Sequence, residues 1–173
     1  MIRKVFFETA WWTGLFSGGI SLAFFIYEQM NGINPFHPFY TFLSISIPVV
    51  MVLFSISYRK QKINGGFIGT GEGVVTGLLT ALIGTNIASI ILYFLMQARP
   101  EIVQEYITQM STEFAAQKAG IIKNHGEKAY SDLIADLGKT TSTNLVLDYF
   151  IKSSAIQFIF ALFAAAFFRK KAS

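Results

Sequence analysis

The chain contains no cysteine and few charged residues, and each shortage excludes a class of protein. Without Cys among its 173 residues, it has no disulfides, thiol nucleophiles or Cys-ligated metals. Only 14% of the residues are charged, against about 25% in soluble domains. The two histidines, His37 and His125, have no acid or second His at metal-ligand spacing. Because hydrolase and metalloprotease motifs are missing as well, we predict no enzymatic activity, no metal and no cofactor.

Apolar residues make up 53% of the chain and are concentrated in four runs. The runs cover residues 9–27, 39–58, 74–96 and 149–168. Each approaches the roughly 20 residues that cross a hydrocarbon core, and too little polar sequence remains to cover all four in a soluble protein. We therefore predict an all-α integral membrane protein with one four-transmembrane-helix bundle over residues 1–173. No A-x-A-like cleavage site follows the first run, so we interpret it as a retained helix and not a signal peptide.

Positive charges lie beside the apolar runs at one set of their ends. Eight of the 14 Lys and Arg residues are there: Arg3, Lys4, Arg59, Lys60, Lys62, Arg169, Lys170 and Lys171. The positive-inside rule places these ends, and with them both termini, in the cytoplasm. The aromatic residues agree with this orientation, because Trp and Tyr favour the headgroup level. The outer ends carry Tyr27, Tyr40, Tyr93 and Tyr149, and the inner ends carry Trp11, Trp12 and Tyr58.

The stretch RKQKINGGFIGTGEGVVTG, residues 59–77, holds six glycines in its last thirteen positions. Gly66 and Gly71 have the spacing of a Walker loop, but Glu72 stands where that loop needs Lys. The dinucleotide pattern fails too, because Val74 occupies its third glycine position. A carboxylate in place of the lysine repels phosphate, so we predict no nucleotide binding. The basic residues flank membrane spans, so we predict no nucleic-acid partner either.

The same stretch has the features of a turn followed by a packing helix. Asn64, Gly65 and Gly66 form a turn signal, because glycine accepts positive φ readily. Small residues then recur every four positions along the third run: Gly69, Gly73, Gly77, Ala81, Thr85 and Ser89. The first run carries a shorter stripe: Ala10, Gly14 and Gly18. Small residues let membrane helices approach closely. The stripe predicts either internal packing on a neighbouring helix or the interface of a homo-oligomer.

The string YRKQKINGGFIGTGEGVVTGLLTAL resembles the signature of family 4199 among the domains of unknown function. The matching positions are Arg59, Asn64, Gly65 and Gly66. The resemblance implies a small bacterial inner-membrane protein with four spans and a long helical loop between the third and fourth. It implies no activity, because the family has none assigned. The family often has a polar Gln or Lys just inside the third helix, and this chain departs from that pattern at Glu72, Val74 and Val75.

Six polar residues inside or beside the spans are candidates for function, because such residues are costly in a membrane. They are Glu8, Glu72, Asn86, Asp148, Lys152 and Gln157. Glu8 and Glu72 lie near the cytoplasmic interface, where we expect water to solvate them; the alternative is an ion pair with Arg59, Lys60 or Lys62. The i,i+4 spacing of Asp148 and Lys152 predicts a structural pair on one helix face, with a role in binding or transport as the alternative. The side-chain amides of Asn86 and Gln157 fall near the midplane of the bilayer, so we expect them to face the bundle interior and to bond to each other or to backbone.

The long loop, residues 97–145, has the pattern of two amphipathic helices outside the cytoplasm. One begins at Pro100 and carries the apolar series Val103, Tyr106, Ile107, Met110 and Phe114. The second carries Tyr130, Leu133, Ile134 and Leu137 and is stopped by Gly138. Such helices could cap the bundle, lie on the lipid bilayer, or bind a partner.

Two functions from different classes follow from these patterns. The first is a non-catalytic accessory or scaffold subunit of the inner membrane, with a membrane-protein partner or as a homo-oligomer. The second is a small oligomeric transporter or channel that uses the polar residues of the third and fourth spans. Ionisable residues facing a wet cavity would distinguish the second from the first.

Overall fold

A computed structural model describes residues 2–170, and within them the side chains of 7–37 and 40–170. The elements in chain order are α1 (Ile2–Met30), α2 (Pro38–Tyr58), η1 (Arg59–Ile63), α3 (Thr70–Ala98), α4 (Glu101–Ala116), α5 (Lys118–His125), α6 (Glu127–Leu137) and α7 (Ser142–Phe168). Four of them, α1, α2, α3 and α7, are long and apolar enough to cross a membrane. The predicted all-α membrane bundle is therefore confirmed, and the chain is a multi-pass membrane protein.

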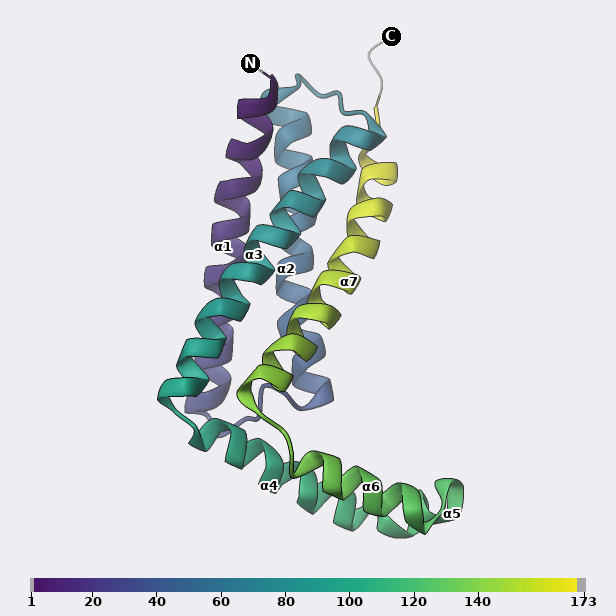
Figure 1. Ribbon diagram of the computed structural model, residues 1–173. Helices are drawn as coiled ribbons and strands as arrows, with labels where there is room; N and C mark the ends of the chain where they lie inside the picture. The colour runs from purple at the N-terminus through teal and green to yellow at the C-terminus, as the bar shows by residue number, and fades with distance from the viewer. Residues whose placement is uncertain (1, 171–173) are drawn as a thin grey trace.

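The four long helices run side by side, and α3 crosses the bundle between α1 and α7 (Figure 1). It packs on α1 along one side and on α7 along the other, while α2 contacts all three. Both chain ends and the connection between α2 and α3 lie at the same end of the bundle (Figure 1). We call this the basic end, and the opposite one the arm end.

Glycines set the distance between α3 and its two main neighbours. A Cβ added at Gly77 would lie 2.9 Å from the Cβ of Ala161 in α7, and one at Gly73 would lie 2.9 Å from that of Ala165. On the other side, a Cβ at Gly18 of α1 would lie 2.9 Å from the carbonyl oxygen of Gly84. Gly14 is equally confined by Ile83, and Ala81 is buried near Ala161 in the same apolar cluster. The small residues of α3 are therefore covered inside the chain, facing two different helices.

The connection at the basic end is a π-helix followed by a tight turn. The π-helix η1 carries the letters RKQKI, and Gly65 and Gly66 follow it with φ angles of 60° and 94°. The turn signal is thus confirmed, because only glycine adopts such angles at little cost. Ile68 then pairs with Lys170 through two backbone hydrogen bonds, which hold the segment after α7 against the α2–α3 connection.

The helices α4, α5 and α6 form an arm, residues Glu101–Leu137, that lies crosswise to the bundle and extends beyond α7 (Figure 1). The first turns of α4 cap the arm end of the bundle, where Ile102 and Val103 join a buried cluster with Phe25 and Tyr149. The rest of the arm leaves the bundle, and none of the residues of α5 is buried.

Several sequence predictions differ from these elements. The helices α1, α3 and α7 extend beyond the predicted runs, because flanking polar turns continue the same hydrogen-bonded helix. The loop holds three helices and not two, since Lys118–His125 is helical up to Gly126. Gly69 does not belong to the packing stripe: it is exposed at the N-cap of α3, with nothing within 4 Å of an added Cβ. Tyr149 is buried inside the bundle, in one apolar cluster with Phe25 and Ile102.

Candidate functional site

Polar side chains line the inside of the bundle along most of its length. In α1 they recur every four residues, which places them on one face of the helix: Thr9, Thr13, Ser17 and Ser21 are all buried. Thr76, Thr80, Thr85 and Ser89 are buried in α3. We call this set, together with Ser153 and Gln157 of α7, the polar seam. Its hydroxyls are small enough to sit where the helices touch.

Gln157 is the central member of the polar seam. Its side chain is completely buried, and its amide nitrogen donates hydrogen bonds to Thr85 Oγ1 at 2.8 Å and to Ser153 Oγ at 2.6 Å. The sequence placed Gln157 near the midplane and inside the bundle, and it lies inside. Its partners are hydroxyls that the sequence did not single out. Within the described residues, its carbonyl oxygen Oε1 has no hydrogen-bond partner.

Asn86 does not face the bundle interior, contrary to the prediction. Its side chain is exposed on the outer face of α3, where Nδ2 donates to the carbonyl oxygen of Leu82 at 2.7 Å. One turn of α3 carries both Asn86 and the buried Thr85, and a rotation of 100° per residue separates their directions. The amide is therefore satisfied within its own helix and makes no contact with Gln157.

Glu28 is a buried acid that lies just beyond the first predicted run, which ends at residue 27. It lies in the last turns of α1, 1% exposed, and Ser44 of α2 donates to its Oε2 at 3.2 Å. Among the described residues, the second oxygen, Oε1, has no hydrogen-bond partner. The predicted run ends at Tyr27 because polar residues follow it, although the helix continues to Met30. The signal that could have found Glu28 is its place in the buried face of α1, seven residues after Ser21.

The residues of the family-like motif meet at the basic end in one ion pair. Arg59 Nε donates to Glu72 Oε1 at 2.7 Å, and Asn64 Nδ2 donates to the same oxygen at 2.7 Å. Arg59 is buried with 2% of its surface exposed, so Glu72 balances a charge held away from water. The π-helix and the Gly65–Gly66 turn bring these residues together across the α2–α3 connection.

The remaining charged candidates lie on the surface. Lys152 Nζ is 2.6 Å from Asp148 Oδ2, and both side chains are more than half exposed, so they form a surface pair. Glu8 is exposed beside a cleft between α1 and α2. The side chains of Arg3 and Lys4, and all of Lys171, lie outside what the structure describes. No group of three or more His, Asp or Glu residues in the described part of the chain has the geometry to hold a metal ion.

The arm is fastened to the bundle by aromatic contacts and one histidine. Tyr106 of α4 meets Phe36 edge to face, and Phe36 in turn meets Phe25 of α1. His37 Nε2 lies 3.3 Å from Glu113 Oε2, which links the start of α2 to α4. Burial raises the pKa of the Tyr106 hydroxyl above its ordinary value, and the nearby charges of Asp148 and Glu113 raise it further.

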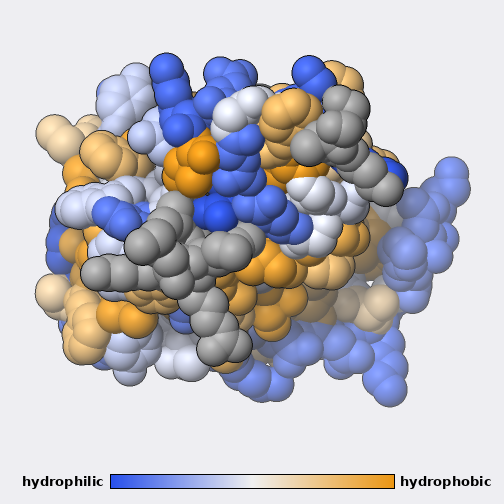
Figure 2. All heavy atoms as spheres, turned by 90° about the horizontal axis from the view of Figure 1, so that it is seen from above, coloured by the Kyte–Doolittle hydropathy of each residue, from blue (hydrophilic) through white to orange (hydrophobic). Residues whose placement is uncertain are grey.

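The arm presents a hydrophilic surface. Figure 2 looks along the bundle from the basic end, and the part of the arm that extends past the bundle is mostly hydrophilic on the face turned toward the viewer. This view is along the spanning helices, so the face of the arm that it shows is the one directed toward the membrane (Figure 1). Within the arm, Met110 and Leu137 are buried. The apolar series predicted for α4 and α6 thus contribute residues to a small core inside the arm.

Comparison with protein families finds one match over nearly the whole chain. The model described as "Protein of unknown function (DUF4199)" matches residues 13–170. The matched range includes all four membrane-span-like helices except the first turns of α1, and it includes the arm. Comparison with the curated proteins finds no match, and comparison with the solved structures finds none.

Proposed function

The chain belongs to the DUF4199 family of proteins of unknown function, and we propose that it is a non-catalytic accessory subunit of the bacterial inner membrane. In this role the bundle is an anchor, and the arm positions a partner protein outside the membrane. The positive-inside rule favours a cytoplasmic basic end, with Lys60, Lys62 and Lys170 next to the spans. The arm then lies on the opposite, extracytoplasmic side.

The observation that carries this proposal is the arm. It extends past α7 with a hydrophilic face toward the membrane plane, so the arm gains little from lying in hydrocarbon (Figure 2). Its first turns are fixed to the bundle through Ile102, Val103 and Tyr106, while α5 has no buried residue. A fixed base with an exposed end is the geometry of a presenting element, and it favours a protein partner over the bilayer as the contact of the arm.

The bundle itself supports an anchoring role. The small residues of α3 are covered by α1 and α7, so they leave no comparable stripe of α3 for a second copy. The polar seam is bonded across the helices, for example between Thr13 Oγ1 and Thr80 Oγ1 at 2.9 Å. Interhelical bonds of this kind contribute about 0.6 kcal/mol each on average.

Native mass spectrometry after gentle extraction from the protein's own membrane tests this proposal. We expect a hetero-complex of fixed stoichiometry that is lost in Leu133→Ser/Lys128→Glu, two exposed positions of α6. The matched control is Lys62→Glu at the basic end, which should keep the complex. A monomer or homo-oligomer without a companion in the unaltered protein contradicts the proposal, and so does a complex that the arm variant leaves unchanged.

Orientation has a direct test, because the chain has no native Cys to interfere. Lys62→Cys should react with a membrane-impermeant thiol reagent only from the cytoplasmic side, and Lys128→Cys only from the other side. Labelling of both positions from the same side contradicts the proposed topology.

A second candidate function is transport of protons or small cations, and Glu28 favours it. An acid with 1% exposure and an oxygen without a partner in the described structure is a functional candidate by default in a membrane protein. In proteoliposomes, this function predicts a flux that Glu28→Gln abolishes and Glu113→Gln, in the arm, leaves intact. Equal leakage with and without protein removes this candidate.

A further inference from the structure

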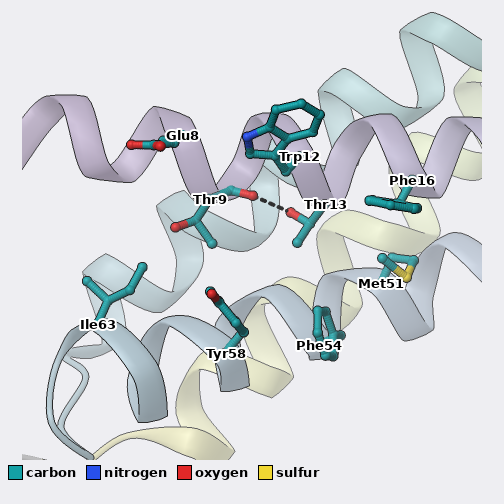
Figure 3. A pocket seen from close by; sticks show the side chains of 9 residues that line it. All are labelled: Glu8, Thr9, Trp12, Thr13, Phe16, Met51, Phe54, Tyr58 and Ile63. Atoms are coloured by element: carbon teal, nitrogen blue, oxygen red, sulfur yellow. Dashed lines mark hydrogen bonds between the residues drawn. The ribbon is translucent and has the colours of Figure 1, made fainter.

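The basic half of the bundle contains a cleft between α1 and α2. It encloses about 460 Å³, within the roughly 300–1,000 Å³ typical of small-molecule sites. Figure 3 shows Phe16 of α1 opposite Met51 and Phe54 of α2, with Glu8 and Ile63 toward the same end of the cleft. Both walls belong to helices of the membrane-spanning set. The cleft therefore opens where lipid surrounds the protein.

The inner wall of the cleft is apolar in effect, although two threonines line it. Thr9 and Thr13 are buried. The Thr13 hydroxyl is 2.8 Å from the carbonyl oxygen of Thr9 and 2.9 Å from Thr80 Oγ1, so its polar atom is engaged within the bundle. What remains for a ligand in the middle of the cleft is aromatic, methyl and thioether surface. A hydrocarbon chain suits such a wall.

A second hollow adjoins the first along α1. It is a shallow, open depression of about 330 Å³ on the surface of α1, and it shares the lining residues Trp12 and Phe16 with the cleft. It continues past Gly19, where an added Cβ would have nothing within 4 Å, to Ala23. From Glu8 to Ala23 a helix rises by about 22 Å, which exceeds half of a hydrocarbon core about 30 Å thick. Two adjoining hollows of this length can hold the two chains of one phospholipid within one leaflet.

The polar end of the cleft carries a negative charge. Glu8 supplies an exposed carboxylate, and Tyr58 an exposed phenol side chain. The ammonium group of a phospholipid headgroup is complementary to this carboxylate. A primary ammonium can donate hydrogen bonds to the carboxylate, whereas a trimethylated one cannot, and a headgroup with only negative charge is repelled by Glu8.

We propose that the cleft between α1 and α2 binds one amine-bearing phospholipid, with its ammonium group at Glu8 and an acyl chain between Phe16 and Phe54. The second chain lies in the adjoining hollow over Gly19. The lipid fills a space that the α1–α2 contact leaves open and joins the two helices near the basic end. This inference concerns the membrane-embedded surface and does not depend on the arm or its partner.

Native mass spectrometry of the full chain, titrated with single lipids of identical acyl chains, tests the headgroup. We expect one phosphatidylethanolamine to bind about fivefold more tightly than phosphatidylcholine or phosphatidylglycerol, a ratio that corresponds to about 1 kcal/mol. Glu8→Gln should bring the ratio to about one. The matched control Glu127→Gln, an exposed acid of the arm, should leave it at about fivefold.

Two further variants test the place of the acyl chains. Gly19→Leu fills the second hollow and should weaken binding of all three lipids, whereas Gly120→Leu in α5, at an equally open glycine, should not. Equal affinity for the three headgroups, a preference that survives Glu8→Gln, or identical behaviour of the two leucine variants overturns the proposal. A dimer that forms as lipid is removed, with the cleft covered by a second copy, also overturns it.

Discussion

The two amides near the midplane have opposite environments, and only one of them holds helices together. Gln157 bonds to hydroxyls of α3 and α7 inside the bundle, while Asn86 bonds to its own helix on the outside. The sequence predicts a similar depth for both, since depth follows from position in the span. It could not tell their directions, because the apolar pattern of α3 surrounds the helix on every face and marks no single inner side.

Leucine substitutions test how much Gln157 and Asn86 each contribute to the stability of the protein. We expect Gln157→Leu to lower the free energy of unfolding by about 1 kcal/mol, because Thr85 and Ser153 lose their donor. Asn86→Leu should change it by less than about 0.5 kcal/mol, because the amide faces outward. Unfolding in mixed micelles of increasing denaturing detergent measures both. Equal effects would mean that Gln157 contributes no more than an outward-facing amide.

The ion pair at the basic end is the second prediction at this scale. We expect Glu72→Ala to cost about 1.5–3 kcal/mol, because the buried Arg59 and the amide of Asn64 both lose an acceptor. Glu101→Ala removes the exposed partner of Arg99 and should leave the melting temperature unchanged. Thermal unfolding of the two variants decides, and equal losses would contradict a stabilising role for the Glu72 pair.

Among the elements, α3 determines the architecture, because its two glycine faces meet different helices. The spacing of four predicted a packing helix, and Gly73 and Gly77 lie in such a contact. Spacing alone could not predict the partner, since the small residues form a broad surface and not one line. Gly69 shows the limit of the pattern, because the helix begins only after it.

Replacement of glycine by alanine tests how closely α3 packs against its neighbours. Gly77→Ala should destabilise the bundle by about 1–3 kcal/mol, because the new Cβ lies 2.9 Å from Ala161 Cβ and 3.0 Å from Ile56 Cδ1. The control is Gly71→Ala in the same helix, where nothing lies within 4 Å and alanine should stabilise by about 0.5–1 kcal/mol. Detergent-induced unfolding compares them. Opposite signs are expected, and a gain of stability in both would show that helix propensity and not packing dominates.

The attachment of the arm should depend on pH through Tyr106. Its pKa is raised in the folded protein, chiefly by burial, so the folded state keeps the phenol proton that the unfolded state releases. Stability is therefore full below the ordinary tyrosine pKa of about 10 and falls as pH rises beyond it. Hydrogen exchange of α4 measured below and above this pH should show the loss, and Tyr106→Phe should reduce it. An unchanged pH dependence in the variant contradicts the assignment.

At the scale of the whole molecule, the chain combines a tightly packed bundle with a projecting arm. Composition and run lengths predicted the spans, because the thickness of a bilayer leaves few alternatives. The direction of the arm could not be predicted from the sequence, because it depends on how Ile102, Val103 and Tyr106 pack against the end of the bundle. The sequence predicts two helices in the arm instead of three, because Gly120 lowers the helix propensity of the segment that forms α5.

Photo-crosslinking in intact membranes tests the accessory role most directly, because it reports contacts before any extraction. A photoreactive residue at Leu133, exposed on α6, should give one discrete protein adduct, whereas the same residue at Phe163, 70% exposed on α7, should give only lipid adducts. No protein adduct at Leu133, or an adduct whose mass is that of a second copy of the chain, would contradict the proposal that the arm holds a partner protein outside the membrane.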